Sequence, residues 1–302
     1  MANWSQVLKE LAECPRKDAL DYTRVKYLKR LHKKTGRNVI CYYSAFLQKP
    51  ELRHMEITDE DKNGFMTAVH NLDRSKGLDL FLHTPGGQTA ATESIVNYLR
   101  QMFGMDIRAI VPQIAMSAGT MIACSCKDIV MGKQSNLGPI DPQFNGIPAQ
   151  GVLEEFNQAI LSIKKDPASI PMWQVIIGKY HPTFLGDCQK AIDMSEQLVQ
   201  AWLETCMLNG DPDAKAKAAN IVAELASHSK TKMHARHIHL DEAKAMGLKI
   251  VSLETDCDQE YQDLVLTIHH TYMHTFGQST SVRIVENHNG QRVVQHVRVG
   301  GK

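Results

Sequence analysis

The stretch LDLFLHTPGGQTAATESIVNYLRQMFGMDIRAIVPQIAMSAGT, residues 78–120, decides the fold, because it holds a strand, a helix and a second strand in succession. Residues 78–83 and 106–112 are apolar runs rich in Leu, Ile and Val, which is typical of buried strands. Between them, Ile95, Val96 and Leu99 recur at helical spacing on one face. A strand, a helix and a strand joined in this way predict a right-handed crossover in a parallel sheet.

The same alternation continues on both sides of this stretch. Residues 37–44 and 128–132 predict two more strands, and residues 117–124 predict a buried helix. Residues 57–72 predict a helix with Thr58 as its N-cap. We therefore expect an α/β fold with a mostly parallel sheet.

Helical patterns flank this core. Residues 4–34 predict helix interrupted at Pro15, and residues 258–276 predict a further helix. The segment 281–297, SVRIVENHNGQRVVQHV, has two alternating runs around an Asn-Gly pair, which predicts a β-hairpin.

These patterns predict three parts of the chain. A helical arm occupies residues 1–36, and the α/β domain occupies residues 37–256, with a helical insertion at about 150–230. Residues 257–302 form a C-terminal helix and β-hairpin.

Composition narrows the class of protein. The 302 residues include 34 Lys and Arg against 33 Asp and Glu, so no net field recruits nucleic acid or an anionic membrane surface. The 7 cysteines have no paired CxxC spacing, and no uncharged run reaches the length of a membrane span. Residues 1–18 also lack the apolar segment of a secretion signal. We expect a reduced, cytoplasmic chain without a membrane span or a nucleic-acid partner.

Two glycine-bearing turns carry the candidate chemistry. HTPGGQT follows the strand at 78–83, and AMSAGT follows the strand at 106–112, so both lie at the carboxyl ends of neighbouring parallel strands. Gly86 and Gly87 allow the backbone to approach closely, and Ser117 begins a helix whose amides favour negative charge. A hydroxyl beside backbone donors is the outline of a nucleophile with an oxyanion hole.

These motifs also carry a resemblance. HTPGG followed by AMSAGT resembles the Clp-fold serine peptidases, which include the Clp protease proteolytic subunit and signal peptide peptidase A. The longer segments LDLFLHTPGGQTAATESIVNYLR, AIVPQIAMSAGTMIACSCKDIVMG and SNLGPIDPQ are most similar to the serine dehydrogenase proteinase family. The resemblance implies a ClpP/crotonase-like spiral of ββα units, with residues 37–256 as the peptidase domain.

Carried over by position, the resemblance implies that Ser117 is the nucleophile. The backbone amides near Gly87 and Ala118 become the oxyanion hole, and the TPGG segment, with Gly86, binds an extended substrate by main-chain pairing. The Clp subunit has a histidine about 25 residues after its serine, where this chain has Asp141. Its acid falls in the stretch KMHARHIHLDEAKAMGL, where this chain has Ala235 with His234 beside it.

Three partners for Ser117 remain open. A rearranged triad uses His234 as the base and Asp141 as the group that orients it, because triads are defined by geometry and not by chain order. A Ser-Lys dyad, as in relatives of signal peptide peptidase A, would use Lys164, Lys165 or Lys232. The third alternative has no base, which makes the chain a binding protein.

The other histidines have simpler interpretations. His83 ends a strand, and we expect it to be packed or hydrogen-bonded and not catalytic. HARHIH, with His237 and His239, lacks a recognisable further ligand for zinc, so we expect no metal site. His269, His270 and His274 lie on one predicted helix, where we expect a polar face or a subunit contact.

The sequence therefore predicts a cytoplasmic serine endopeptidase that acts on peptides or proteins without a cofactor. The resemblance also implies a homo-oligomer, because Clp-fold relatives form closed assemblies. One alternative is a catalytically inactive scaffold that binds peptides. A second is an acyl-CoA-processing enzyme on the crotonase fold, in which the serine of AMSAG has no necessary task.

Overall fold

The computed structural model describes residues 4–144, 146–226 and 235–297. Its centre is a seven-stranded sheet in the order β10-β5-β3-β2-β1-β11-β12. The five parallel strands are β1 (Asn38–Ser44), β2 (Leu78–His83), β3 (Ile107–Val111), β5 (Asp128–Met131) and β10 (Ile250–Ser252). The predicted α/β fold with a mostly parallel sheet is confirmed.

The C-terminal hairpin extends this sheet. Strand β11 (Ser281–Asn287) pairs antiparallel with β1, and β12 (Arg292–His296) pairs antiparallel with β11. The predicted hairpin is thus confirmed.

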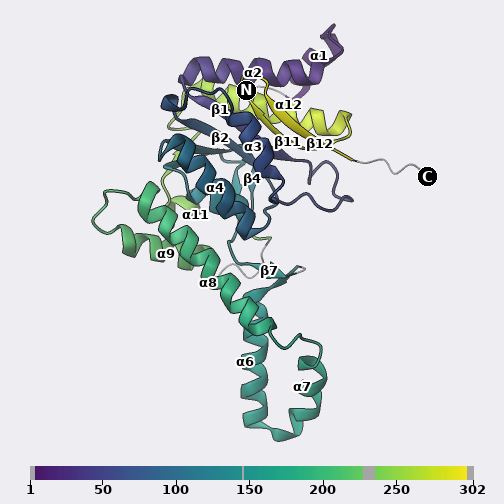
Figure 1. Cartoon of the computed structure of the whole chain (residues 1–302), viewed down its shortest axis with the longest axis vertical. Coiled ribbons are helices and arrows are strands. Elements are labelled where there is room, and N and C mark those ends of the chain that lie inside the picture. The colour runs from purple at the N-terminus through teal and green to yellow at the C-terminus, as the bar shows by residue number, and fades with distance from the viewer. Residues whose placement is uncertain (1–3, 145, 227–234, 298–302) are drawn as a thin grey trace, which may run out of the picture.

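Helices cover both faces of the sheet (Figure 1). One face packs against α2 (Ala19–Thr35) and α12 (Gln259–Gln278), with α1 (Trp4–Glu13) beyond them. The opposite face packs against α3 (Asp61–Val69), α4 (Thr89–Phe103), α5 (Ala118–Cys124), α9 (Ala214–Ala226), α11 (Leu240–Ala245) and the second half of α8 (Phe184–Trp202). A buried ion pair between Arg24 and Glu286, with N and O 3.0 Å apart, joins α2 to β11.

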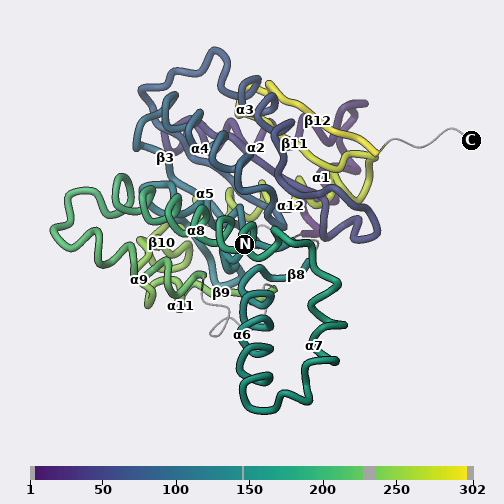
Figure 2. Tube along the Cα trace, turned by 60° about the horizontal axis from the view of Figure 1, so that its bottom comes forward, coloured from purple at the N-terminus to yellow at the C-terminus, as the bar shows by residue number. Residues whose placement is uncertain are grey.

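The predicted helical insertion reaches away from this body in both Figure 1 and Figure 2. Helix α6 (Ala149–Lys165) and α7 (Ile170–Ile177) form its outer part, and the first half of α8 packs against α6 around Val152 and Cys188. Short elements join these helices: η2 (Pro167–Ser169) precedes α7, and the π-helix η3 (Leu203–Met207) continues α8. A further short helix, η1 (Arg74–Lys76), precedes β2.

The sequence patterns did not predict two small sheets. One joins β4 (Ile114–Ala115), β6 (Asn136–Leu137) and β9 (Ile238–His239), and the other pairs β7 (Gln143–Phe144) with β8 (Ile147–Pro148). Their strands have two residues each, too few for any periodicity to be visible.

The predicted N-cap at Thr58 is wrong. Helix α3 begins at Asp61, whose carboxylate accepts a hydrogen bond from the Thr58 amide over 2.8 Å and two from the guanidinium of Arg283. These bonds hold residues 58–61 as a turn that precedes the helix. Arg283, although distant in the sequence, thus helps to hold Asp61 at the start of α3.

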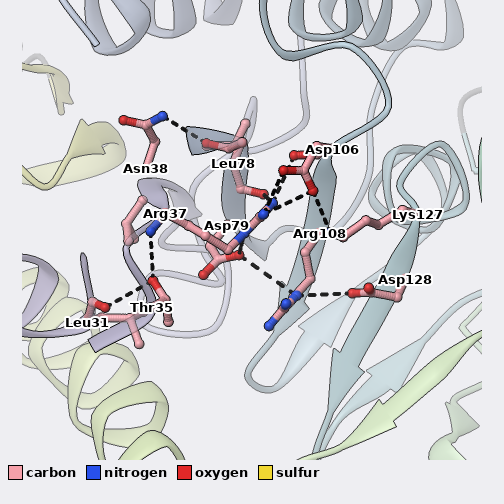
Figure 3. Close-up of polar contacts among 12 residues, drawn as sticks. Leu31, Thr35, Arg37, Asn38, Leu78, Asp79, Asp106, Arg108, Lys127 and Asp128 are labelled. Carbon is pink, nitrogen blue, oxygen red and sulfur yellow. Dashed lines mark hydrogen bonds and ion pairs between the residues drawn. The ribbon is translucent and has the colours of Figure 1, made fainter. Parts of the chain in front are cut away.

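An ion-pair network lies at the amino ends of the parallel strands (Figure 3). The guanidinium of Arg37 donates to the carboxylates of Asp79 and Asp106, and Arg108 lies between Asp79 and Asp128. Lys127 pairs with Asp106 as well. Although burial raises the pKa of Asp106, the bonds from Arg37 and Lys127 outweigh it and hold that pKa at about 2. The network ties neighbouring strands together at the end of the sheet opposite the glycine-bearing turns.

Candidate active site

Ser117 lies in a strained turn between β4 and α5. Its backbone has φ 49° and ψ −114°, and it is one of three described non-glycine residues with positive φ. Such a conformation costs about 1–3 kcal/mol and persists only where surrounding contacts enforce it. The chain therefore tolerates strain to present this serine, which is half-buried.

The two glycine-bearing turns touch each other. The Thr84 amide donates to the Ile114 carbonyl, and the Met116 amide donates to the Thr84 carbonyl, each over 3.1 Å. A Cβ atom on Gly119 would lie 2.5 Å from the Cγ2 atom of Thr84, so no side chain fits there. This pairing places HTPGG directly beside AMSAGT, as the order of β2 and β3 in the sheet predicts.

Gly87 is held by pairing on one side only. The Ile57 amide donates to the Gly86 carbonyl over 2.7 Å, and the Gln88 amide donates to the Ile57 carbonyl over 2.9 Å. In such a bridge the Gly87 amide faces away from Ile57, because donors alternate along an extended strand. A Cβ atom on Gly87 would lie 2.3 Å from the Ile57 nitrogen, which explains the second glycine.

Two backbone amides beside Ser117 are available as donors. Ala118 is the first residue of α5, where an amide has no intrahelical acceptor. Within the described part of the chain, neither this amide nor that of Gly87 donates a hydrogen bond. Both amides can therefore donate to a negatively charged oxygen that forms next to Ser117.

A cavity of about 700 Å³ opens at Ser117. Its walls come from the TPGG turn, from the start of α5, from helix α8 and from the segment that follows β6. The lining residues are Glu56, Pro85, Gly86, Gly87, Gln88, Thr89, Ser117, Met121, Ile140, Pro142, Gln143, Phe144, Gly146 and Ala191.

Asp141 lies beside this cavity, between two of its lining residues. Its side chain is buried, with 2% of its surface exposed, and Ile140 and Pro142 on either side line the cavity wall. The Ile140 amide donates to the Leu225 carbonyl over 3.1 Å, which holds this segment against α9. The structure thus brings Asp141 into the neighbourhood of Ser117.

Thr120 fixes the segment that carries Asp141, and sequence reasoning missed it. Its hydroxyl donates to the Ala115 carbonyl and accepts from the Gly138 amide, each over 2.9 Å. A Cβ atom on Gly138 would lie 2.6 Å from the Cε atom of Met116, so a larger residue there would require the Met116 side chain to move. The signal was the threonine that ends the motif SAGT.

The candidate bases are placed differently. His234 and Lys232 lie outside the described residues, while Ala235 is the first described residue of that segment. Strand β9 pairs antiparallel with β6, which brings the chain after Ala235 alongside the segment that leads to Asp141. Lys164 and Lys165 are exposed in the last turn of α6, a helix that extends away from the central sheet (Figure 1).

His83 lies beneath the TPGG turn as a packed residue, as predicted. Its ring is fully buried, with centroids 5.4 Å from Tyr43, 4.9 Å from Phe46 and 5.2 Å from His269. Burial lowers the pKa of His83 to about 3, so the ring is neutral at physiological pH.

His269 and His274 do not form the expected polar face of α12, and the alternative of a subunit contact stays a prediction. His269 and His274 are only 6% and 5% exposed, because α12 packs on the sheet and against α1, where the rings of Trp4 and His274 lie 4.1 Å apart and tilted by 48°. Nowhere in residues 4–144, 146–226 and 235–297 do three His, Cys, Asp or Glu side chains gather as a metal site would require.

No helix within these same ranges has the length and apolar character that crossing a membrane requires.

Comparison with known proteins adds the family. Residues 11–291 match the model of the ClpP-like SDH-type serine proteinases. Two proteins of Methanocaldococcus jannaschii are also similar: the uncharacterized protein MJ0137, 37% identical over 102 residues, and the uncharacterized protein MJ1495, 31% identical over 138 residues. These alignments cover 34% and 44% of this chain and 35% and 46% of the relatives, so the chain spans less than half the length of the curated relatives it matches.

Proposed function

Because the chain belongs to the family of ClpP-like SDH-type serine proteinases, we propose that it is a serine endopeptidase in which Ser117 attacks a peptide carbonyl. The observation that carries this proposal is the strained turn of Ser117, which lies against Gly86 and lines a cavity of about 700 Å³. A serine used only for packing would not need positive φ.

Each step of acyl transfer has a group assigned to it. The Ser117 oxygen attacks the carbonyl carbon while a base removes its proton, and the amides of Gly87 and Ala118 donate to the oxyanion. The leaving amine then takes the proton, and water releases the acyl group by the same route. The extended TPGG segment holds the substrate by main-chain pairing.

The base in this proposal is His234, oriented by Asp141. Two observations support the assignment. Asp141 is buried beside the Ser117 cavity, and β9, which follows His234 in the chain, pairs with β6, the strand that leads to Asp141. Lys164 and Lys165 are unfavourable because they lie at the exposed end of the insertion.

The cellular setting belongs to the same proposal. We infer a cytoplasmic homo-oligomer that needs no cofactor, acts on peptides or proteins, and is built from the helical arm at 1–36, the peptidase domain at 37–256 and the C-terminal helix and hairpin at 257–302. The insertion with α6 and α7 exposes apolar side chains, among them Leu161 and Val175, that an oligomer contact would cover.

A fluorophosphonate probe tests the activity. We expect it to label the wild-type protein but not Ser117→Ala. The control is Ser75→Ala, which removes an exposed serine away from the cavity and should still be labelled. Loss of labelling in His234→Ala, with Lys232→Ala still labelled, would support the triad. A well-folded wild-type protein without any labelling would instead favour the inactive, peptide-binding scaffold.

A further inference from the structure

The cavity at Ser117 has a single charged lining residue among those described. Glu56 stands at its edge, and every other described lining residue is neutral. Several of these, such as Met121, Ile140 and Phe144, are apolar. The cavity therefore combines one negative charge with walls that are partly apolar.

The backbone holds Glu56 in place. Its carbonyl accepts a hydrogen bond from the Arg283 guanidinium over 2.8 Å. The amide and the carbonyl of the next residue, Ile57, are hydrogen-bonded to Gly86 and Gln88. Ile57 is buried, with 1% of its surface exposed. Glu56 lies next to it at a bend of the chain and lines the cavity, and its side chain is 41% exposed.

The carboxylate of Glu56 has no lysine or arginine ion-pair partner among the described residues. The guanidinium of Arg283 makes two hydrogen bonds to Asp61, of 2.9 and 3.1 Å, so these two charges balance each other. The ion-pair partner found for Glu56 is His54, whose nitrogen lies 3.5 Å away and whose side chain is 87% exposed. The Glu56 carboxylate can therefore attract a cation from the ligand.

We propose that Glu56 makes this cavity selective for peptides with a cationic side chain, lysine or arginine, near the bond held at Ser117. The inference deepens the proposed peptidase function and rests on it for its biological meaning. The guanidinium or ammonium group forms a charge-assisted hydrogen bond to Glu56, and its methylene stem packs on the apolar walls. The preference is a property of binding and is therefore measurable without catalysis.

The test uses Ser117→Ala protein, which cannot cleave the probe. Fluorescently labelled heptapeptides, alanine except at one position, carry there either arginine or its uncharged isostere citrulline. We expect at least one arginine peptide to bind about fivefold more tightly than its citrulline partner, as measured by fluorescence anisotropy. The ratio decreases as salt is added, because Glu56 is partly exposed and its charge is screened.

Two further variants identify the residue responsible. In Ser117→Ala/Glu56→Gln the arginine preference disappears, while in Ser117→Ala/Glu60→Gln it remains. Glu60 is a matched control because it is an exposed glutamate of the same segment that lines a different cavity. Equal binding of all pairs, or a preference that survives Glu56→Gln, would overturn the inference. Failure of the peptidase proposal is separate, since it shows as absent fluorophosphonate labelling of the wild-type protein.

Discussion

A Cβ atom on Gly86 would lie 2.7 Å from the Cβ atom of Ser117, closer than two such atoms can approach. The turn that carries Ser117 and the TPGG turn are therefore in direct contact. Gly86 has φ +110° and Ser117 has φ 49°, so two unusual backbone conformations face each other. This contact sets the distance between the serine and the amide of Gly87.

Gly86→Ala should remove both stability and reactivity. The positive φ and the clash together cost about 2–4 kcal/mol, and the displaced turn slows fluorophosphonate labelling between about tenfold and 100-fold. Gly36→Ala is the control, because Gly36 also has positive φ but has no atom within 4 Å of an added Cβ. It should lose only about 1 kcal/mol. Equal behaviour of the two variants would contradict the importance of the contact.

Thr120→Val should loosen the segment that carries Asp141. The substitution leaves the Gly138 amide and the Ala115 carbonyl without their shared hydroxyl partner, which costs about 1–3 kcal/mol in the free energy of unfolding. We also expect slower labelling of Ser117, measured on protein that is folded by circular dichroism. Thr120→Ser keeps the hydroxyl and should restore the labelling rate. If Thr120→Ser behaves like Thr120→Val, the hydrogen bonds are not the cause.

Arg37→Met should separate stability from reactivity. The substitution removes the hydrogen bonds to Asp79 and Asp106 in the network of Figure 3 and leaves the buried Asp79 with one cation fewer. Breaking such a buried pair costs about 3–5 kcal/mol. The network lies at the amino ends of the strands, so the labelling rate of the folded variant should stay within about twofold of wild type. A large decrease in labelling would mean that the two ends of the sheet are coupled.

His83 should make the fold sensitive to acid. Its pKa is about 3 in the folded protein, because of burial, against an ordinary value near 6.5 when unfolded. Below pH 6.5 the unfolded chain therefore binds a proton that the folded chain does not. Stability is then lost as pH decreases from about 6.5 towards 3, with a slope of at most about 1.4 kcal/mol per pH unit.

The measurement is urea unfolding at a series of pH values. His83→Leu should flatten this slope, whereas His181→Leu, which replaces an exposed histidine, should not. Burial also lowers the pKa of His269, so the double variant His83→Leu/His269→Leu should be flatter still. Parallel curves for wild type and both single variants would refute the role of His83.

The sequence predicted much of the fold and part of the candidate site. The apolar runs at 78–83 and 106–112 identified neighbouring parallel strands, and strands of that kind place the turns that follow them at one edge. The position of Ser117 between an apolar run and a glycine followed from the same pattern. The resemblance added the family, which the match over residues 11–291 shows as well.

The remaining features depend on contacts between distant parts of the chain. The sequence could not show that Ile57 pairs with Gly87, that Thr120 holds Gly138, or that Glu56 borders the cavity. Thr58 has the residue type of an N-cap, yet α3 begins only at Asp61, whose carboxylate accepts hydrogen bonds from the Thr58 amide and from the distant Arg283.

The division follows from the range of the forces involved. Apolar periodicity and glycine conformation act within a few residues, so the sequence by itself determined the parallel strands and the serine turn between them. Hydrogen bonds and ion pairs across the fold form only after the sheet has brought their partners together. The tertiary structure alone therefore decided which side chains surround Ser117 and which charge faces its cavity.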